Sequence, residues 1–397
     1  MRERMSDQSR TLLALIICQI GLHSCMTGIR LAAPLQALRL GHSAFAVGVL
    51  LAFFAAAPIV LALRAGRLAD RHGYHRPMRI AVALTAGGGL LAVLSTWAGA
   101  AQFVMLCGAA TLAGGGANFG MIAIQRTAGR TARDSTERMR VFSWLGLAPA
   151  IANLLGPVLA GALIDLSGFL AAFSALMLLP LATLWWARQV PSETMPVRDA
   201  EAAEATAWDL LLAPGVRRLL LVNWLLSACW DLHTFLLPIL GHERGLSASA
   251  IGTILGVFAL AVTAVRLLIP VIAHHMDEAR VLSGAMLWTA VVMGAYPFMR
   301  SAWSMGACAL LLGLGLGTVQ PMIMSTLHHI TPSQRHGEAI ALRSLAINLS
   351  SALMPLVFGV MGAALGAASL FWAVGATVAA GSWPARLVGQ PAAPLRT

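Results

Sequence analysis

Charged side chains are scarce in this sequence, and lysine is absent altogether. Only 11% of the 397 residues are charged, 58% are apolar, and the mean hydropathy is +0.77. A soluble domain carries roughly a quarter of its residues as charged ones, so the shortage excludes a soluble protein. Apolar runs of about 20 residues, the length that crosses a bilayer as a helix, recur from near Leu12 to near Leu387 and predict an integral membrane protein.

All 27 basic residues are arginines, and they give the chain a formal net charge of +11. Most of them occupy short gaps between apolar runs, as membrane topology signals do, and they form no patch on a soluble face. Nucleic acid is therefore not an expected partner.

Cysteine is also rare, and its positions exclude two kinds of site. The five cysteines all lie inside apolar segments, which predicts buried free thiols and neither a disulfide framework nor a zinc site. The segment Met1 to Arg10 is short and basic, and the apolar run after it is longer than a signal core, so no cleavable signal is expected.

The apolar runs predict an all-α membrane protein, because continuous apolar segments cannot form the alternating strands of a membrane barrel. We expect twelve transmembrane helices, with limits near 11–38, 44–64, 79–98, 102–126, 140–164, 168–187, 217–240, 248–272, 280–299, 303–328, 337–363 and 367–387.

The arginines predict the orientation. Four of the 27 are counted as intramembrane (Arg30, Arg126, Arg266 and Arg343), and with the N-terminus inside only three (Arg39, Arg244 and Arg300) fall in outer loops. The remaining twenty occupy inner segments, so both termini are expected in the cytoplasm of a bacterial-type inner (plasma) membrane.

The chain is predicted to consist of two six-helix halves, residues 1–187 and 217–397, joined by a polar cytoplasmic linker at 188–216. An offset of 204 positions superposes Cys25 on Cys229 and Pro34 on Pro238, and later helices match at offsets near 200, including Pro157 near Pro355. Two parallel six-helix repeats are the architecture of a rocking transporter with its site between the halves.

A glycine-rich, charged segment separates the second and third predicted helices. It reads Gly66-Arg67-Leu68-Ala69-Asp70-Arg71-His72-Gly73-Tyr74-His75-Arg76. This segment resembles the cytoplasmic signature of the major facilitator superfamily (MFS), and the resemblance extends over all twelve helices and the repeat. It implies that Gly66, Asp70, Arg71, Gly73 and Arg76 gate the cytoplasmic side. A purely topogenic basic loop is the alternative interpretation.

The fifth predicted helix contains Gly156-Pro157-Val158-Leu159-Ala160-Gly161. The segment resembles an element of the drug:proton antiporter branch, in which Gly156 and Pro157 would help to gate transport, although Ala160 replaces a glycine. Close helix packing by small residues is an equally good interpretation. The fourth helix also lacks the arginine of that branch, and the first has no carboxylate.

Neither a cofactor nor a metal is expected. The glycine string from Gly313 to Gly317 lies inside an apolar helix with no preceding strand, so it is not a phosphate loop. The adjacent pairs His274-His275 and His328-His329 diverge on a helix, which makes them poor joint metal ligands.

Polar residues at middle depths of the predicted helices are the candidate solute and coupling site, because such groups are costly in lipid. The repeat makes Asp231 equivalent to Thr27, one turn from Arg30, so an Asp231–Arg30 ion pair between the halves is a geometric possibility. Asp165 is expected to be a solvated helix end. The candidates are Gln19, His23, Arg30, Asn118, Asn223, Trp230, Asp231, His233, Gln320, Arg343 and Asn348.

These observations predict a secondary active transporter and not an enzyme. It would move a small organic solute by alternating access, as proton-coupled efflux, with Asp231, His23 or His233 as the proton carrier. The alternatives are uptake of an organic anion, favoured by the deep arginines, and a transport-inactive membrane receptor with the same fold. A monomer in the lipid bilayer is expected, with protons and the solute as its partners.

Overall fold

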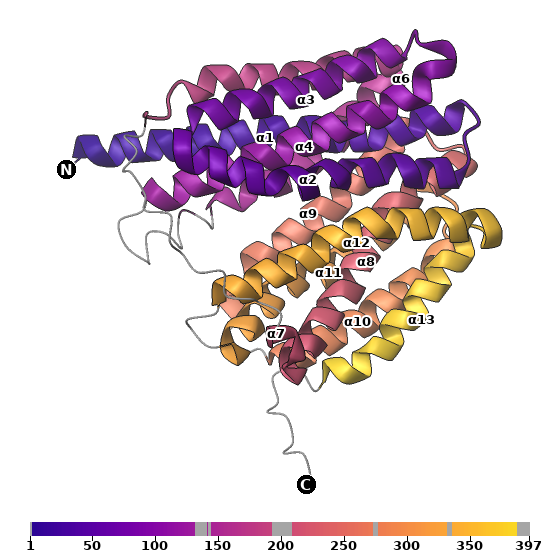
Figure 1. Ribbon diagram of the computed structural model, residues 1–397. Helices are drawn as coiled ribbons and strands as arrows, with labels where there is room; N and C mark the ends of the chain where they lie inside the picture. Colours follow the sequence, from indigo (N-terminus) through magenta and orange to yellow (C-terminus); the bar gives the residue numbers. More distant parts are fainter. Residues whose placement is uncertain are drawn as a thin grey trace. The chain divides into compact units, whose positions relative to one another are not determined.

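The described residues of the computed structural model form helices and the short connections between them (Figure 1). The description covers residues 2–131, 141, 144–192, 209–272, 277–331 and 336–386. Its elements are α1 (Arg2–Arg39), α2 (Ala44–His72), α3 (His75–Ser95), η1 (Gly99–Ala101), α4 (Gln102–Thr131), α6 (Leu147–Ala187), α7 (Asp209–Leu212), α8 (Pro214–Glu243), α9 (Ala248–Ile272), α10 (Glu278–Ala295), η3 (Tyr296–Phe298), α11 (Ala302–Ile330), α12 (His336–Leu365) and α13 (Ala367–Ala385).

Twelve helical segments of the described chain can be matched to the twelve predicted helices. Ten helices are long and apolar enough to cross a membrane. One of them, α6, has 41 residues and contains Gly168 with a non-helical φ of 83°, so it consists of two helices, the predicted fifth and sixth. The twelfth is α13, which has 19 residues and no charged side chain. The prediction of an all-α membrane fold is confirmed.

Backbone chemistry explains where the observed helix ends differ from the predicted ones. The second helix continues eight residues beyond its predicted end at Arg64, to His72, and stops at Gly73, whose φ of 65° only glycine adopts readily. The ninth was expected to reach Met299, but α10 ends at Ala295 and a 3₁₀ turn follows. Tyr296 is still helical, but Pro297 has no amide hydrogen to donate to the next helical hydrogen bond, which explains the early end.

The chain forms two compact units. The first contains residues 1–198 together with Leu237–Ala259, and the second contains Asp199–Leu236 together with Leu260–Thr397. The helices α8 and α9 therefore contribute to both units. The division at 188–216 predicted from the sequence follows the repeat, and it stays a prediction.

Within the first unit, α1 packs chiefly along α6, and α4 packs on both α2 and α3. Small residues allow these helices to approach closely, as membrane helices require. A Cβ atom at Gly88 of α3 would lie 2.8 Å from both the carbonyl oxygen of Ala109 and the amide nitrogen of Ala113 on α4. The two backbones are thus in direct contact at this crossing.

Within the second unit, α10 packs against α11 and α13. The Ser283 hydroxyl on α10 donates to the carbonyl of Ser382 on α13 over 3.1 Å. At the other end of α10, the Tyr296 ring stacks on Phe371 with 4.7 Å between ring centroids. Both ends of this helix pair are therefore fixed by specific contacts.

Candidate functional site

Two serines of α12 hold the deepest acid of the second unit. Asp231 on α8 is only 4% exposed, and its carboxylate accepts hydrogen bonds from the hydroxyls of Ser350 at 3.4 Å and Ser351 at 3.3 Å. Sequence reasoning found Asp231 but missed both serines. The position of Ser350 at the centre of the eleventh predicted helix, 337–363, is the signal that could have found it.

A second polar contact joins the same two helices about two turns away. Asn223 on α8 is 1% exposed, and its Oδ1 atom accepts a hydrogen bond from Nε of Arg343 on α12 over 3.3 Å. Arg343 is half-buried, as is Arg266 on α9, and the two positive charges act on one another. The structure therefore brings together three of the sequence-predicted residues, Asn223, Asp231 and Arg343, along the α8–α12 contact.

The first unit has a corresponding contact that carries no charge. Thr27 on α1 donates its hydroxyl to the carbonyl oxygen of Ala152 on α6 over 2.9 Å. The repeat makes Thr27 equivalent to Asp231, and it makes Ala152 equivalent to Ser350 at the offset that pairs Pro157 with Pro355. A helix contact made by a hydroxyl and a backbone carbonyl in one repeat is thus made by a carboxylate and hydroxyls in the other.

The other predicted residues of the first unit lie mostly along one helix. Gln19 is buried, and His23 and Arg30 are half-buried on α1 at spacings of four and seven residues, which place them on one face. The charge of Arg30 acts on His23. Asn118 is half-buried on α4. Arg30 belongs to the first unit and Asp231 to the second, and their ion pair stays a prediction.

The remaining predicted residues of the second unit differ in burial and in their described contacts. His233 is fully buried, and its ring lies edge-on to Tyr296 with 5.6 Å between centroids, in the aromatic packing that continues to Phe371. Two positions along a helix turn a side chain through roughly 200°, so His233 leaves α8 on the side away from Asp231. Trp230 on α8 is half-buried, whereas Gln320 on α11 and Asn348 on α12 are exposed.

The charged segment predicted to gate transport is partly described. Gly66, Asp70 and Arg71 belong to α2, and the chain turns at Gly73 instead of at Gly66. Arg76 is exposed in the first turn of α3. The side chains of Asp70 and Arg71 lie outside the described residues, so the cytoplasmic latch stays a prediction.

The glycines of the fifth-helix element lie at close helix contacts. A Cβ atom at Gly156 would collide with the Thr27 hydroxyl on α1, and one at Gly161 would collide with the carbonyl oxygen of Ala248 at the start of α9. Pro157 is buried. The element therefore packs α6 against two helices at once, which supports the packing interpretation and is compatible with a role in gating.

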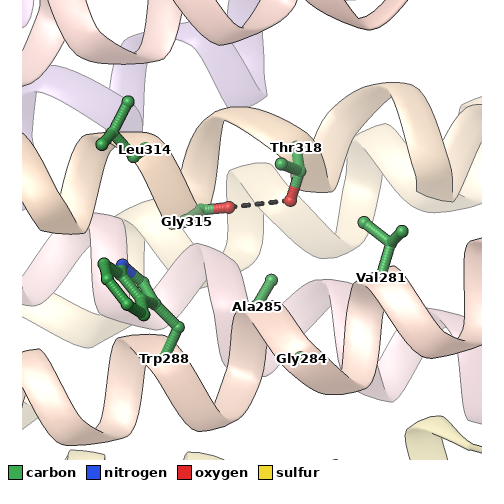
Figure 2. A pocket seen from close by; sticks show the side chains of 7 residues that line it. All are labelled: Val281, Gly284, Ala285, Trp288, Leu314, Gly315 and Thr318. Atoms are coloured by element: carbon green, nitrogen blue, oxygen red, sulfur yellow. Dashed lines mark hydrogen bonds between the residues drawn. The ribbon is translucent and has the colours of Figure 1, made fainter. Parts of the chain in front are cut away.

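An apolar surface groove lies between α10 and α11 (Figure 2). Its volume is about 240 Å³, and the one hydroxyl in its lining, that of Thr318, donates to the carbonyl of Gly315 on its own helix. The groove includes none of the predicted site residues, and its lining offers a solute little polar recognition. The lining residues are Val281, Gly284, Ala285, Trp288, Leu314, Gly315 and Thr318.

Comparison with known proteins agrees with this architecture. The profile of the Major Facilitator Superfamily matches residues 15–279 and 219–396. No curated protein sequence matches the chain.

Similar solved structures include a POT family transporter in complex with 5-aminolevulinic acid (14% identity, 94% of this chain and 95% of that one, TM-score 0.75). A bacterial homologue of the iron transporter ferroportin in the inward-facing state is 17% identical over 97% of this chain and 98% of that one, with a TM-score of 0.72. The nucleoside transporter NupG is 13% identical over 96% and 98%, also with a TM-score of 0.72. At these identities the likeness shows the fold.

The multi-pass helical fold is that of an integral membrane protein, and the profile match identifies the family. The chain belongs to the Major Facilitator Superfamily. It is a secondary transporter of small solutes and not an enzyme.

Proposed function

We propose that this transporter exports a small organic solute in exchange for protons, and that Asp231 carries the proton. It acts as a monomer in a bacterial-type inner membrane, with both termini in the cytoplasm. The excess of arginines in the predicted inner segments supports this orientation. The resemblance of the Gly156 to Gly161 element to the drug:proton antiporter branch supports the direction of transport.

The contact between Asp231 and the two serines carries the proposal. A hydroxyl can either donate or accept a hydrogen bond. Ser350 and Ser351 can therefore donate to the charged carboxylate, and they can accept from the carboxylic acid once it is protonated. An arginine partner alone would favour only the charged form. The serine contact suits a carboxyl group that gains and loses a proton during transport.

The test begins with a ligand-stabilisation screen of the purified protein against organic acids and cationic drugs. The stabilising solute is then followed in proteoliposomes, both in exchange without a gradient and in accumulation driven by a pH gradient. Asp231→Asn should retain exchange and lose gradient-driven accumulation. The matched control is Ser351→Ala, which keeps the acid and should keep accumulation. Full gradient-driven transport by Asp231→Asn would show that Asp231 is not the carrier.

A second candidate function, uptake of an organic anion, is supported by the half-buried pair Arg266 and Arg343. Two like charges inside membrane helices are unfavourable unless an anion accompanies them. Asn223 orients one of these guanidinium groups through its bond to Nε, which leaves the terminal nitrogens for a carboxylate. Stabilisation by organic acids alone, lost in Arg343→Gln, would favour uptake over export.

The sequence also left a transport-inactive receptor as an alternative, which membership of a transporter family disfavours. It would bind the stabilising solute, yet show no exchange in proteoliposomes with either the original chain or Asp231→Asn. The buried polar contacts at Asp231 and Asn223 argue against this alternative, because a protein that no longer transports has less need of costly polar groups inside the membrane.

A further inference from the structure

Asp165, expected to be a solvated helix end, binds the beginning of another helix. Its side chain is exposed, but its two carboxylate oxygens accept hydrogen bonds from the amides of Ala248 at 3.0 Å and Ser249 at 2.7 Å. These residues are 83 and 84 positions away in the sequence. The acid thus joins the end of the first helix of α6 to the first turn of α9.

This carboxylate completes the N-terminus of α9. The first amides of a helix have no partner within it, and they form the positive end of the helix dipole. Ser247 provides the local cap, because its hydroxyl accepts from the amide of Ala250 over 3.2 Å. Asp165 supplies acceptors for the two amides before that, so both charge and hydrogen bonding attract it to this helix end.

On the N-terminal side of Asp165 in α6, the two helices approach until their backbones are in contact. A Cβ atom at Gly161 would collide with the carbonyl oxygen of Ala248, and one at Gly252 would collide with that of Pro157. One turn further along α9, a Cβ atom at Gly256 would lie 2.8 Å from Cγ2 of Val158. We call this row of contacts between α6 and α9 the α6–α9 seam.

The seam explains why Leu237–Ala259 belongs to the first compact unit, although the repeat assigns this segment to the second half. The chain continues directly from Ala259 into the part of α9 that belongs to the second unit. A single helix is therefore held by the first unit at its N-terminal end and by the second unit beyond it. Release of the seam would free that end of α9.

The repeat shows that this acid is not needed simply to start a helix. Ser43, the counterpart of Ser247, caps α2 by accepting from the amide of Ala46 over 3.3 Å. At the offset that matches both Pro157 with Pro355 and Gly168 with Gly366, the counterpart of Asp165 is Ala363, which has no carboxylate. The second acceptor at α9 is therefore an addition made in one repeat only.

We infer that Asp165 is a gating residue, whose bidentate bond to the first turn of α9 holds the α6–α9 seam closed in one state of the transport cycle. Flexible water-exposed hydrogen bonds of this kind can be exchanged for water when the helices part, whereas a buried ion pair could not be broken as readily. The inference rests on membership of a transporter family and is independent of the solute and of proton coupling.

The experiment measures how readily the seam opens. Val158→Cys places a reporter thiol at the seam, and its rate of reaction with a maleimide is followed in detergent-purified full-length protein, so that membrane orientation does not matter. The five native cysteines are buried and free, and protein without the reporter gives their background rate. We expect Asp165→Ala to raise the reporter's rate about fivefold or more, which corresponds to about 1 kcal/mol.

Asp277→Ala is the matched control. Asp277 also caps a helix, but it does so locally, by accepting from the amide of Arg280 over 3.0 Å in α10. Its loss should leave the rate at Val158→Cys unchanged. An equal rise in both variants would mean general loosening and would overturn the inference, as would an unchanged rate in Asp165→Ala.

A second variant covers the case in which Asp165→Ala does not fold. Asp165→Asn keeps one acceptor oxygen and loses the charge, so it should give an intermediate rate, and a rate equal to that of the original chain would refute the gating role. Asp165→Glu keeps both oxygens and should restore a slow rate. Because maleimide labelling requires neither a solute nor a pH gradient, failure here is distinguishable from failure of the proposed function.

Discussion

Two adjacent glycines of α3 offer a direct test of the helix packing in the first unit. A Cβ atom at Gly88 would lie 2.8 Å from two backbone atoms of α4, those of Ala109 and Ala113, whereas one at Gly87 would meet only a leucine methyl group, at 3.8 Å. Ordinary van der Waals contact for a Cβ atom begins near 3.4 Å. Gly88→Ala therefore requires the two helices to separate, and Gly87→Ala does not.

The difference between these two variants isolates the cost of that separation. Each substitution gains the same ~1 kcal/mol of helix propensity, so this gain cancels in the comparison. Overpacking a close contact costs about 1–3 kcal/mol. We therefore expect Gly88→Ala to be less stable than Gly87→Ala by about that amount, with Gly87→Ala at least as stable as the original chain.

The assay can use the native cysteines. All five are buried, so a thiol-reactive dye reports unfolding of the detergent-purified protein, followed as a half-life at one elevated temperature. A difference of about 1 kcal/mol shortens the half-life about fivefold if the α3–α4 packing is lost before the transition state for unfolding. Equal half-lives for Gly87→Ala and Gly88→Ala would refute the close contact.

Substitutions at three further positions test the polar contacts by the same stability assay combined with solute exchange. Asn223→Leu removes the acceptor for Arg343 Nε and should lower the free energy of unfolding by about 1–3 kcal/mol. Asn223→Asp keeps an acceptor and should retain stability. Equal stability of these two variants would contradict the Asn223–Arg343 hydrogen bond. Thr27→Ala removes one hydroxyl bond and should cost about 1 kcal/mol with exchange intact; lost exchange in a stable protein would instead place Thr27 at the solute. His233→Phe should preserve exchange, because the ring packs on Tyr296, and a stable but inactive variant would show that this histidine acts in transport.

The sequence by itself determined the membrane fold and most helix limits. Lipid offers the backbone no hydrogen-bond partners, so an apolar run of sufficient length has to be a helix whatever its neighbours are. The predicted limits of the fourth helix, 102–126, and the eighth, 248–272, agree with α4 and α9 to within a few residues. The repeat can also be found without the structure, since it needs only the comparison of one half of the sequence with the other.

Ends of helices depended on chemistry that hydropathy does not record. The charged segment after Arg64 was expected outside the helix because it is polar, yet the helix continues until Gly73 permits the turn. Arginine is a good helix former, and beyond the bilayer water can solvate the charged side chains. Hydropathy thus marks where the lipid ends, whereas glycine and proline mark where the helix ends.

The tertiary structure decided which polar groups meet. Asp231 was recognisable as a costly buried acid, but its serine partners are 119 and 120 residues away, and no local pattern distinguishes them from other small residues of an apolar helix. Asp165 was expected to be bound by water alone, because sequence shows only that it ends a helix; the amides it binds belong to a helix more than 80 residues later. Burial in lipid constrains each segment separately, so it can be predicted along the chain. Hydrogen bonds between helices depend on which helices pack against one another, and only the tertiary structure decides this.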